Sequence, residues 1–526
     1  CRMDTHKPGV LATCNSAATA SWRHKLVVVL TTLCLAIGAN YIAAALPTLK
    51  TIILQHTYYH GHLIDNAKYG VMMSASTLIN TVLPILSGVF VDLYGPALIA
   101  ILFSSSIVVG SLLLALGASS GNFNLINAGE ILHGIGNVTV HMCQLKLYAH
   151  WFRGSADTGP GLLGLLTGLD VAIGRVFGLI GTLTPIPLSE ATGKWYWAFW
   201  LGLIFSIFAW ALALVYMCYE YTLPSSMRVS TALDAKRDSV YHRIRAFLPQ
   251  LWTNTIDLPA AFWILIFLQL LQTGVVATYG SNTVDIMVQT RGHASQEDVK
   301  LSAYKYSMHY AIPIVLTPLV GYGFDLWGHR SHVVIFGAAF YVISMALLGF
   351  SHVHPAVPLL FDAFGYTVNN VPFVATIPLL VKRPSLIGTA HGFWKSYNAS
   401  GETIMQIVGG ALQDRAVSNG LPQSQKYNYM LYLLLAMKGV DFFYGMIYHY
   451  LDTRYFGSVM LMSEKQRAKQ EAELDVSGDT PPGTLCSPRI VWTVAGCIVS
   501  VLMIAAAYTI FIVFWITDPE RKPGSA

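Results

Sequence analysis

The sequence GYGFDLWGHR, at residues 321–330, occurs in a second version as GVFVDLYGP, at residues 88–96. Both versions have the spacing Gly-x3-Asp-x2-Gly. This spacing suits a tight turn between helices, because glycine allows close approach and an aspartate can accept hydrogen bonds from a neighbouring helix N-terminus. Two such turns in one chain predict an internally duplicated fold. The residues expected to gate or pack at these turns are Gly88, Asp92, Gly95, Gly321, Asp325, Gly328 and Arg330.

The composition of the chain is typical of a membrane protein. Of its 526 residues, 54% are hydrophobic and 11% are charged, whereas about 25% of residues are charged in a soluble domain. The hydrophobic residues form long runs, and about 20 apolar residues in a helix cross a bilayer. Helices are expected rather than strands, because the runs do not alternate. The predicted spans cover about residues 26–47, 69–91, 97–118, 123–149, 160–185, 195–220, 258–288, 301–324, 332–352, 354–381, 387–412, 428–451 and 489–516.

Two polar stretches, at residues 221–256 and 452–488, divide the spans into six, six and one. The predicted fold is all-α and transmembrane, with twelve core helices in two six-helix bundles and a thirteenth helix near the C-terminus. Basic residues gather in the N-terminal tail, the central loop and the linker, so these segments are expected in the cytosol. The predicted segments are a tail (1–23), the first bundle (24–221), a central loop (222–257), the second bundle (258–452), a linker (453–488), the extra helix (489–516) and a tail (517–526).

The paired Gly-Asp-Gly turns resemble the signature loop of the major facilitator superfamily, and the resemblance covers about residues 24–452. In that family the loop continues with basic residues. The second copy here follows the pattern with Arg330, whereas the first copy has Pro96 and Ala97. The resemblance implies an alternating-access transporter, in which two bundles rock about a binding site near the middle of the membrane.

Three further segments resemble the lysosomal dipeptide uniporter branch of this superfamily. They are GEILHGIGN with YAHWFRG (129–137 and 148–154), SAYKYSMHYAIPIVLTPLVGYGFD (302–325) and IGTAHGFWKSYNASGETIMQIVGGALQD (387–414). This resemblance implies dipeptides or amino acids as substrates and favours a lysosomal or vacuolar membrane over the plasma membrane. The branch carries a fourth-helix glutamate for the peptide amino group, where Asn137 and Val138 stand here. Its fifth-helix arginine, for the peptide carboxylate, has its nearest equivalent in Arg175.

Several predicted spans carry polar residues along one face. Ionisable residues inside a membrane are costly and usually face a cavity, and residues at i, i+3, i+4 and i+7 share a helix face. Cations could meet a substrate carboxylate and anions its amino group. The alternative, that these residues only pair with each other or cap helices, stays open. The candidate substrate-binding residues are Asn40, Tyr41, Asn137, His141, Gln144, Asp170, Arg175, Gln272, Tyr279, Lys305, His309, Asp362, Asn369, Lys395, Asn398 and Glu402.

The motifs that the sequence lacks narrow the function further. It has no P-loop, no dinucleotide fingerprint, no HExxH and no recognisable nucleophile–base pair, so we expect no cofactor, no metal, no nucleic acid and no enzymatic activity. The expected partners are the lipid bilayer and a small solute. We therefore predict a transporter of small zwitterionic solutes. Two alternatives stay open: a proton-coupled organic-anion symporter, which histidines such as His309 would suit, and a transporter-fold receptor that binds an accessory membrane subunit through the thirteenth helix.

Overall fold

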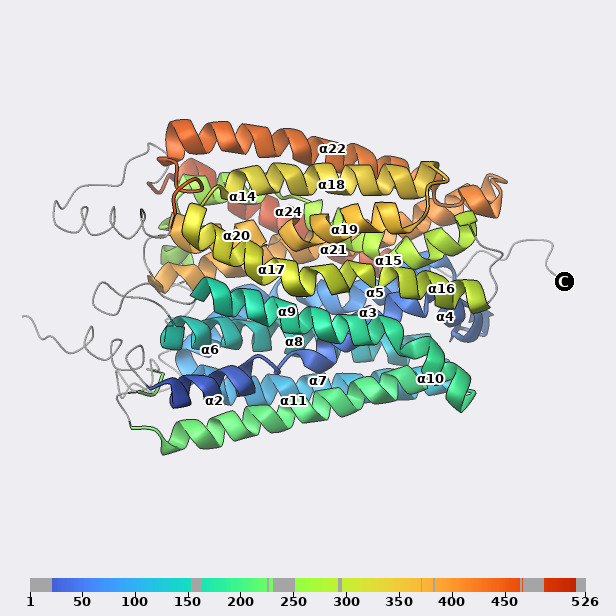
Figure 1. Ribbon diagram of the computed structural model, residues 1–526, viewed down its shortest axis with the longest axis horizontal. Coiled ribbons are helices and arrows are strands. Elements are labelled where there is room, and N and C mark those ends of the chain that lie inside the picture. Colours follow the sequence, from blue (N-terminus) through green and yellow to red (C-terminus); the bar gives the residue numbers. More distant parts are fainter. Residues whose placement is uncertain are drawn as a thin grey trace, which may run out of the picture.

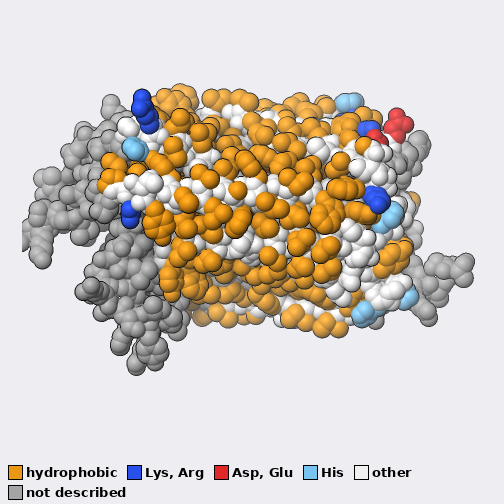
Figure 2. All heavy atoms as spheres, turned by 90° about the horizontal axis from the view of Figure 1, so that it is seen from below, with side chains coloured by type: hydrophobic (Ala, Val, Ile, Leu, Met, Phe, Trp, Pro, Cys, Tyr) orange, Lys and Arg blue, Asp and Glu red, His pale blue; other side chains and the backbone are white. Residues whose placement is uncertain are grey.

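The computed structural model describes residues 21–152, 163–224, 227–229, 251–291, 296–369, 371–381, 384–463, 466 and 487–516. Within these residues the chain is almost entirely helical, and the long helices run along the long axis of the molecule (Figure 1). A broad hydrophobic band covers the middle of the face in Figure 2, and charged side chains lie at its two ends. A bilayer requires this distribution, because lipid-facing positions must be apolar and helices satisfy their own backbone.

The first half of the chain forms helices that follow the predicted spans, with two breaks. The first predicted span is divided at residues 33–36 and the second at residues 80–82. The second break has a cause in the sequence: Pro84 lacks an N–H, and its ring would clash with the carbonyl group four residues earlier. The helices are α2 (Trp22–Thr32), α3 (Ile37–Thr48), α4 (Lys50–His56), α5 (Asn66–Ile79), α6 (Leu83–Tyr94), α7 (Pro96–Ser120), α8 (Phe123–Phe152), α9 (Leu163–Leu183), α10 (Pro185–Thr192) and α11 (Trp197–Thr222).

The second half also follows the predicted spans, and its first span is broken at residues 269–271. Leu271 there has a φ of 66°, a left-handed conformation that costs about 1–3 kcal/mol for a residue other than glycine. The helices are α14 (Ala260–Leu268), α15 (Gln272–Arg291), α16 (Gln296–Tyr306), α17 (Met308–Trp327), α18 (Arg330–Phe350), α19 (Ala356–Asn369), α20 (Val371–Leu380), α21 (Pro384–Ser418), α22 (Asn428–Leu451) and α24 (Ile490–Ile516).

Short elements complete the fold. Two antiparallel strands, β1 (Tyr58–Tyr59) and β2 (His62–Leu63), follow α4, a 3-10 turn (Gln423–Gln425) precedes α22, and a π-helical turn (Asp452–Phe456) follows it. None of these was predicted from the sequence. Most of the predicted central loop and linker, and both tails, lie outside the described residues, so the predicted segment boundaries there stay predictions.

Within the described residues, nine helical segments are long and apolar enough to cross a membrane. Four of the predicted spans fall outside this set: α8, α17, α21, and α19 together with α20, of which α19 is apolar but short. These helices carry many of the polar residues that the sequence placed along one face. The predicted total of thirteen spans therefore stays a prediction, although every predicted span has a helix at its position.

The two signature loops form the expected tight turns. Gly95 and Gly328 both have a positive φ, 86° and 72°, which glycine adopts without strain. The side chains of Asp92 and Asp325 lie outside the described part of the structure. Arg330 donates from its backbone N–H to the carbonyl oxygen of Met460 at 2.9 Å, and from its guanidinium to Met462 at 3.0 Å. The segment after α22 therefore packs on the second loop, at what we call the Arg330 end of the bundle.

The two halves contact each other along two lines of helices. On one line, α5 and α6 pack against α21; on the other, α9 packs against α17. Backbones come close on the first line: a Cβ added to Gly70 would lie 2.7 Å from the carbonyl oxygen of Gln406, and one added to Gly410 would lie 2.4 Å from that of Asn66. Small residues allow this close approach of membrane helices.

A buried polar cluster joins the halves at the end opposite Arg330, which we call the Lys50 end. The Lys50 ammonium, on α4, donates to Asn282 at 2.7 Å and to Gln413 at 3.1 Å, both in the second half. It also lies 3.6 Å from the carboxylate of Asp285, and Lys426 lies 3.4 Å from the same oxygen. The Lys50 side chain is 1% exposed. These contacts close the Lys50 end between the two halves.

The same end carries two further contacts between the halves. Asp414, on α21, accepts hydrogen bonds at 2.9 Å from the side chain of Asn66 and from the backbone N–H of Ala67, at the start of α5. At the surface, Lys300 of α16 forms an ion pair with Glu190 of α10 at 2.5 Å. The closure thus combines a buried ion pair with an exposed one.

The helix α24, which was predicted as a thirteenth span, packs against α21, α5 and α14. Its buried residues form one stripe, Thr493, Gly496, Ser500, Ala507 and Phe511. Near its start, it contacts the second half: the Tyr397 hydroxyl donates to the carbonyl oxygen of Gly496 at 2.9 Å. Near its end, it contacts the first half: the Lys68 ammonium donates to the carbonyl oxygen of Trp515. The helix therefore crosses from one half of the molecule to the other.

The contact between α15 and α21 generates a test of packing. A Cβ added to Gly274 would lie 2.2 Å from the carbonyl oxygen of Gly401, and overpacking of this kind costs roughly 1–3 kcal/mol. We expect Gly274→Leu to lower the midpoint of thermal unfolding in detergent. Gly439→Leu is the control, since nothing lies within 4 Å of the position of its Cβ. Equal midpoints for the two variants would contradict the described helix contact.

The Lys50 cluster generates a second test. Lys50→Met leaves Asp285 with one cation fewer, and breaking a buried ion pair costs roughly 3–5 kcal/mol. We expect a large fall in the thermal midpoint, which is not recovered when Asp285→Asn is added, because that change would leave the buried Lys426 without its carboxylate. Lys300→Met removes a lysine from the exposed pair with Glu190, so its effect should be much smaller. An effect of Lys50→Met no larger than that of Lys300→Met would refute the assigned role of the cluster.

Candidate functional site

An arginine of the first half lies on an aromatic cluster of the second half. The guanidinium carbon of Arg175, on α9, is 3.3 Å from the centre of the Tyr366 ring, on α19. Arg175 also interacts electrostatically with Tyr310, Tyr306 and Asp362. Its side chain is half-buried, and no hydrogen bond or ion pair joins it to any other residue that the structure describes. The guanidinium therefore keeps its hydrogen-bond donors available to a bound molecule.

A buried histidine–carboxylate pair lies next to the Tyr366 ring. The Nδ1 atom of His309, on α17, is 2.5 Å from Oδ2 of Asp362, and Asp362 is fully buried. The His309 ring stacks on Tyr366 at 3.8 Å between centres and on Tyr306 at 4.9 Å. The second oxygen of Asp362 has no hydrogen-bond partner among the described residues. Both residues were predicted to bind substrate, and the structure pairs them with each other.

Two further charged residues lie on α21, each half-buried. Lys395 and Glu402 interact electrostatically with each other, and Lys395 also interacts with His141 of α8 in the opposite half. They are seven residues apart, and no ion pair within 4 Å joins them in the described structure. A side chain buried in the middle of a bundle without such a partner is costly unless it faces a cavity. Lys395 thus interacts with His141 of the opposite half, and Glu402 interacts with Lys395 along the same helix.

The fourth and fifth spans carry a carboxylate with several partners. Asp170, on α9, accepts a hydrogen bond from Gln144 at 2.9 Å and from the Tyr148 hydroxyl at 2.8 Å. His141 lies 3.8 Å from its other oxygen, with a side chain 36% exposed. Gln144 is fully buried and also donates to the carbonyl oxygen of Thr32 at 2.7 Å. Asp170 is therefore stabilised within the first half, and His141 is the member of this group that faces open space.

Other predicted residues are engaged in contacts between helices. The Tyr41 hydroxyl bonds to Thr184 at 3.0 Å, and that of Tyr279 bonds to Ser344 at 3.0 Å; both tyrosines are fully buried. Asn398 accepts from Thr273 at 3.0 Å, and Gln272 donates to a backbone carbonyl of α22 at 3.3 Å. We propose that these four residues support the helices that carry the site rather than touching the substrate.

The remaining predicted residues are less constrained. Asn40 lies against α9, where a Cβ added to Gly174 would be 3.0 Å from its side-chain nitrogen. Asn137 is half-buried on α8, and Lys305 is half-buried in the last turn of α16. Asn369 ends α19, and its side chain lies outside the described part of the structure. Their roles in substrate binding stay predictions.

Sequence reasoning missed the aromatic surroundings of Arg175 and the closure at the Lys50 end. Tyr306 and Tyr310 lie three residues and one residue from His309, so the helical spacing that selected His309 could have selected Tyr306 too. Lys50 and Asp285 lie near predicted span ends, where charged residues are usually exposed to water. Only the fold brings these two side chains together.

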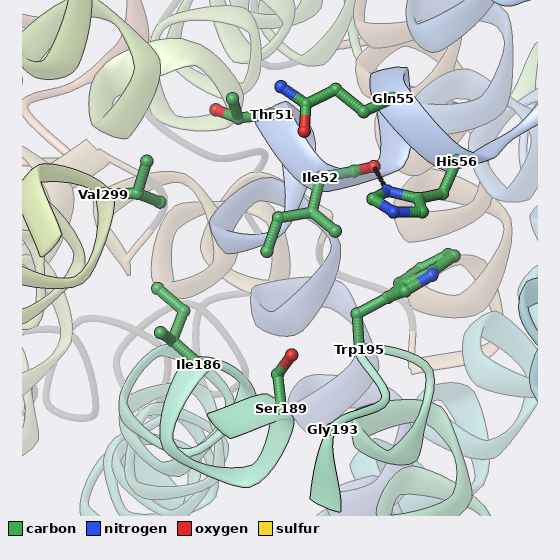
Figure 3. A pocket seen from close by; sticks show the side chains of 9 residues that line it. All are labelled: Thr51, Ile52, Gln55, His56, Ile186, Ser189, Gly193, Trp195 and Val299. Carbon is green, nitrogen blue, oxygen red and sulfur yellow. Dashed lines mark hydrogen bonds between the residues drawn. The ribbon is translucent and has the colours of Figure 1, made fainter. Parts of the chain in front are cut away.

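A separate cavity of about 240 Å³ lies at the Lys50 end, lined by Thr51, Ile52, Gln55, His56, Ile186, Ser189, Gly193, Trp195 and Val299 (Figure 3). It lies between α4, α10 and α16, and none of the candidate substrate-binding residues lines it. His56 bonds to the carbonyl oxygen of Ile52 at 3.0 Å. Because it lacks a charged lining residue apart from this histidine, the cavity is a poor match for a zwitterion.

Comparisons with known proteins agree on the family. Residues 28–414 match the Major Facilitator Superfamily. The lysosomal dipeptide transporter MFSD1 of Homo sapiens is 22% identical over 77% of this chain and 83% of its own length, and that of Mus musculus is 23% identical over 67% and 73%. Among solved structures, the nucleoside transporter NupG has a TM-score of 0.55 at 14% identity and covers 81% of this chain and 98% of its own. The Escherichia coli fucose:proton symporter FucP has a TM-score of 0.52 at 14% identity, with the same coverage.

These matches confirm the predicted facilitator fold and the prediction of a multi-pass membrane transporter rather than an enzyme. The structural neighbours support the fold alone, because their sequences are less than 25% identical to this chain. The match to the family covers well over half of the chain. The chain belongs to the Major Facilitator Superfamily.

Proposed function

We propose that this transporter carries small zwitterionic solutes by alternating access, with dipeptides as the first candidates. The observation that carries the proposal is that three half-buried charges, Arg175, Lys395 and Glu402, each lack a hydrogen-bonded or ion-paired partner in the described structure. Two cations can meet a carboxylate, and one anion can meet an amino group. Buried charges of both signs are best compensated by a ligand that carries both. The MFSD1 relatives, described as lysosomal dipeptide transporters, support this substrate class.

Glu402 takes the role that a fourth-helix glutamate has in the dipeptide branch. Asn137 stands at that fourth-helix position here, and His141, one turn further, faces Lys395 of α21. The anionic end of the site would thus lie on the eleventh span instead of the fourth. Arg175, from the fifth span, would bind the carboxylate.

We place the protein in a lysosomal or vacuolar membrane, with the N-terminus and the Arg330 end in the cytosol. The location rests on the MFSD1 relatives, and the orientation rests on the basic loops. An accessory membrane subunit stays a prediction, since α24 packs on helices of its own chain.

Charge removal at the site tests this function. We expect purified protein in liposomes to take up a radiolabelled dipeptide saturably, and Arg175→Gln and Glu402→Gln each to lower kcat/KM at least tenfold, because a hydrogen bond to a charged group contributes about 1.5–3 kcal/mol. Arg175→Gln should impair dipeptides with a free carboxylate most, and Glu402→Gln those with a free amino group.

The matched controls are Arg415→Gln, at an exposed position of α21, and Glu297→Gln, at an exposed position of α16. Both should keep uptake near that of the unmodified protein. Absence of saturable uptake across varied dipeptides and pH values would remove this substrate class.

The His309–Asp362 pair favours one second candidate, a proton-coupled symporter of organic anions. Its 2.5 Å contact lies beside Arg175, where a proton and a substrate anion could be exchanged together. With equal substrate on both sides of the membrane, a facilitator should show no net uptake when a pH gradient is imposed, and this is the result we expect. Net uptake that Asp362→Asn or Glu402→Gln abolishes would establish the symporter instead.

A further inference from the structure

The Arg175 side chain is held by one face of a tyrosine. Its guanidinium carbon lies 3.3 Å from the centre of the Tyr366 ring. A guanidinium that pointed an N–H at the ring would hold its carbon farther away, because a C–N bond of about 1.3 Å would stand between them. The guanidinium therefore lies flat on the ring. Arginine commonly stacks on aromatic rings in this way.

Flat stacking leaves the edge of the guanidinium open. The N–H donors of arginine lie in the guanidinium plane, and a carboxylate binds to two of them along one edge. In the described part of the chain, nothing accepts a hydrogen bond from Arg175. The ring and a carboxylate would thus use different sides of the same group, so Tyr366 does not compete with an anionic ligand.

The Tyr366 ring is itself held in place by packing against other side chains. His309 stacks on its other face at 3.8 Å and 23°, and Tyr306 stacks on His309 at 4.9 Å and 18°. Asp362, one helical turn before Tyr366 on α19, binds the His309 ring at 2.5 Å. The Tyr306 and His309 side chains are buried. The ring that carries Arg175 therefore has little freedom to rotate.

We propose that Tyr366 is a positioning residue, which holds the Arg175 guanidinium flat so that its N–H edge faces the carboxylate of the transported solute. The proposal rests on the proposed function in one respect, that the solute carries a carboxylate. A fixed guanidinium loses less conformational freedom when a ligand binds, so it binds more tightly than a mobile one. Tyr366 would thereby select solutes with a free carboxylate, although it donates no hydrogen bond to them.

The test compares ligands with and without a carboxylate. Glycylglycine and its C-terminal amide are measured as competitors of uptake in liposomes, and the ratio of their inhibition constants is the readout. We expect Tyr366→Leu to raise the inhibition constant of glycylglycine about tenfold and to leave that of the amide unchanged. Tyr366→Phe restores the ring face and should restore the ratio. In an Arg175→Gln background, Tyr366→Leu should have no further effect on the ratio.

Tyr432→Leu is the control, because Tyr432 stacks on Phe350 at an exposed position, and it should leave the ratio unchanged. If Tyr366→Leu raised the inhibition constants of both ligands equally, Tyr366 would have a merely structural role and the proposal would be overturned. An unchanged inhibition constant for both ligands would overturn it as well.

Failure of the dipeptide assignment is detected separately. If the unmodified protein binds no dipeptide, propionate and propionamide are compared by thermal shift in detergent. Stabilisation by propionate alone, lost in Tyr366→Leu and regained in Tyr366→Phe, would uphold the positioning role while removing dipeptides as substrates. No difference between the two ligands, or a difference that survives Tyr366→Leu, would overturn the positioning role.

Discussion

Lipid cannot solvate a charge, so each charged side chain within the bundle requires a partner or an aqueous space. This constraint separates the interior charges into two groups. Lys50 with Asp285, Lys438 with Asp441, and His309 with Asp362 are paired at 2.5–3.6 Å. Arg175, Lys395 and Glu402 are instead half-buried, and no described residue pairs with them. The first group contributes contacts within the fold, and the second group is the basis of our proposal for the solute site.

The unpaired charges belong to both halves of the molecule. Arg175 lies on α9, and Lys395 and Glu402 lie on α21, so a zwitterion bound among them would connect the two bundles. The backbone is irregular nearby: Leu271, with its left-handed conformation, packs directly against Gly401, the neighbour of Glu402. Broken helices are tolerated within a membrane where they line a cavity or are buried in protein. The strained turn thus lies beside the chain segment that carries Glu402.

The sequence predicts the helices better than it predicts the site. Long apolar runs and the repeated Gly-Asp-Gly turn depend on local composition, and each predicted span has a helix at its position. Pro84 explains one helix break locally, whereas no residue in the sequence around Leu271 predicts the helix break there. The partners of a side chain are harder to predict from sequence. Local spacing determines which residues share a helix face, but tertiary packing determines which other helix that face contacts. The sequence offered Asp170, Tyr41 and Arg175 alike as candidates, yet only contacts show that the first two have hydrogen-bond partners.

The predicted thirteenth helix, α24, contacts both halves of the molecule, one near each of its ends. Most of α24 is not covered by the described part of the chain, since its buried residues form a single stripe from Thr493 to Phe511. Membrane helices adjust to bilayer thickness chiefly by tilting. A tilt of α24 moves Gly496, bound to Tyr397 of the second half, relative to Trp515, bound to Lys68 of the first half. A change in bilayer thickness that tilted α24 would therefore act on contacts with both bundles through this one helix.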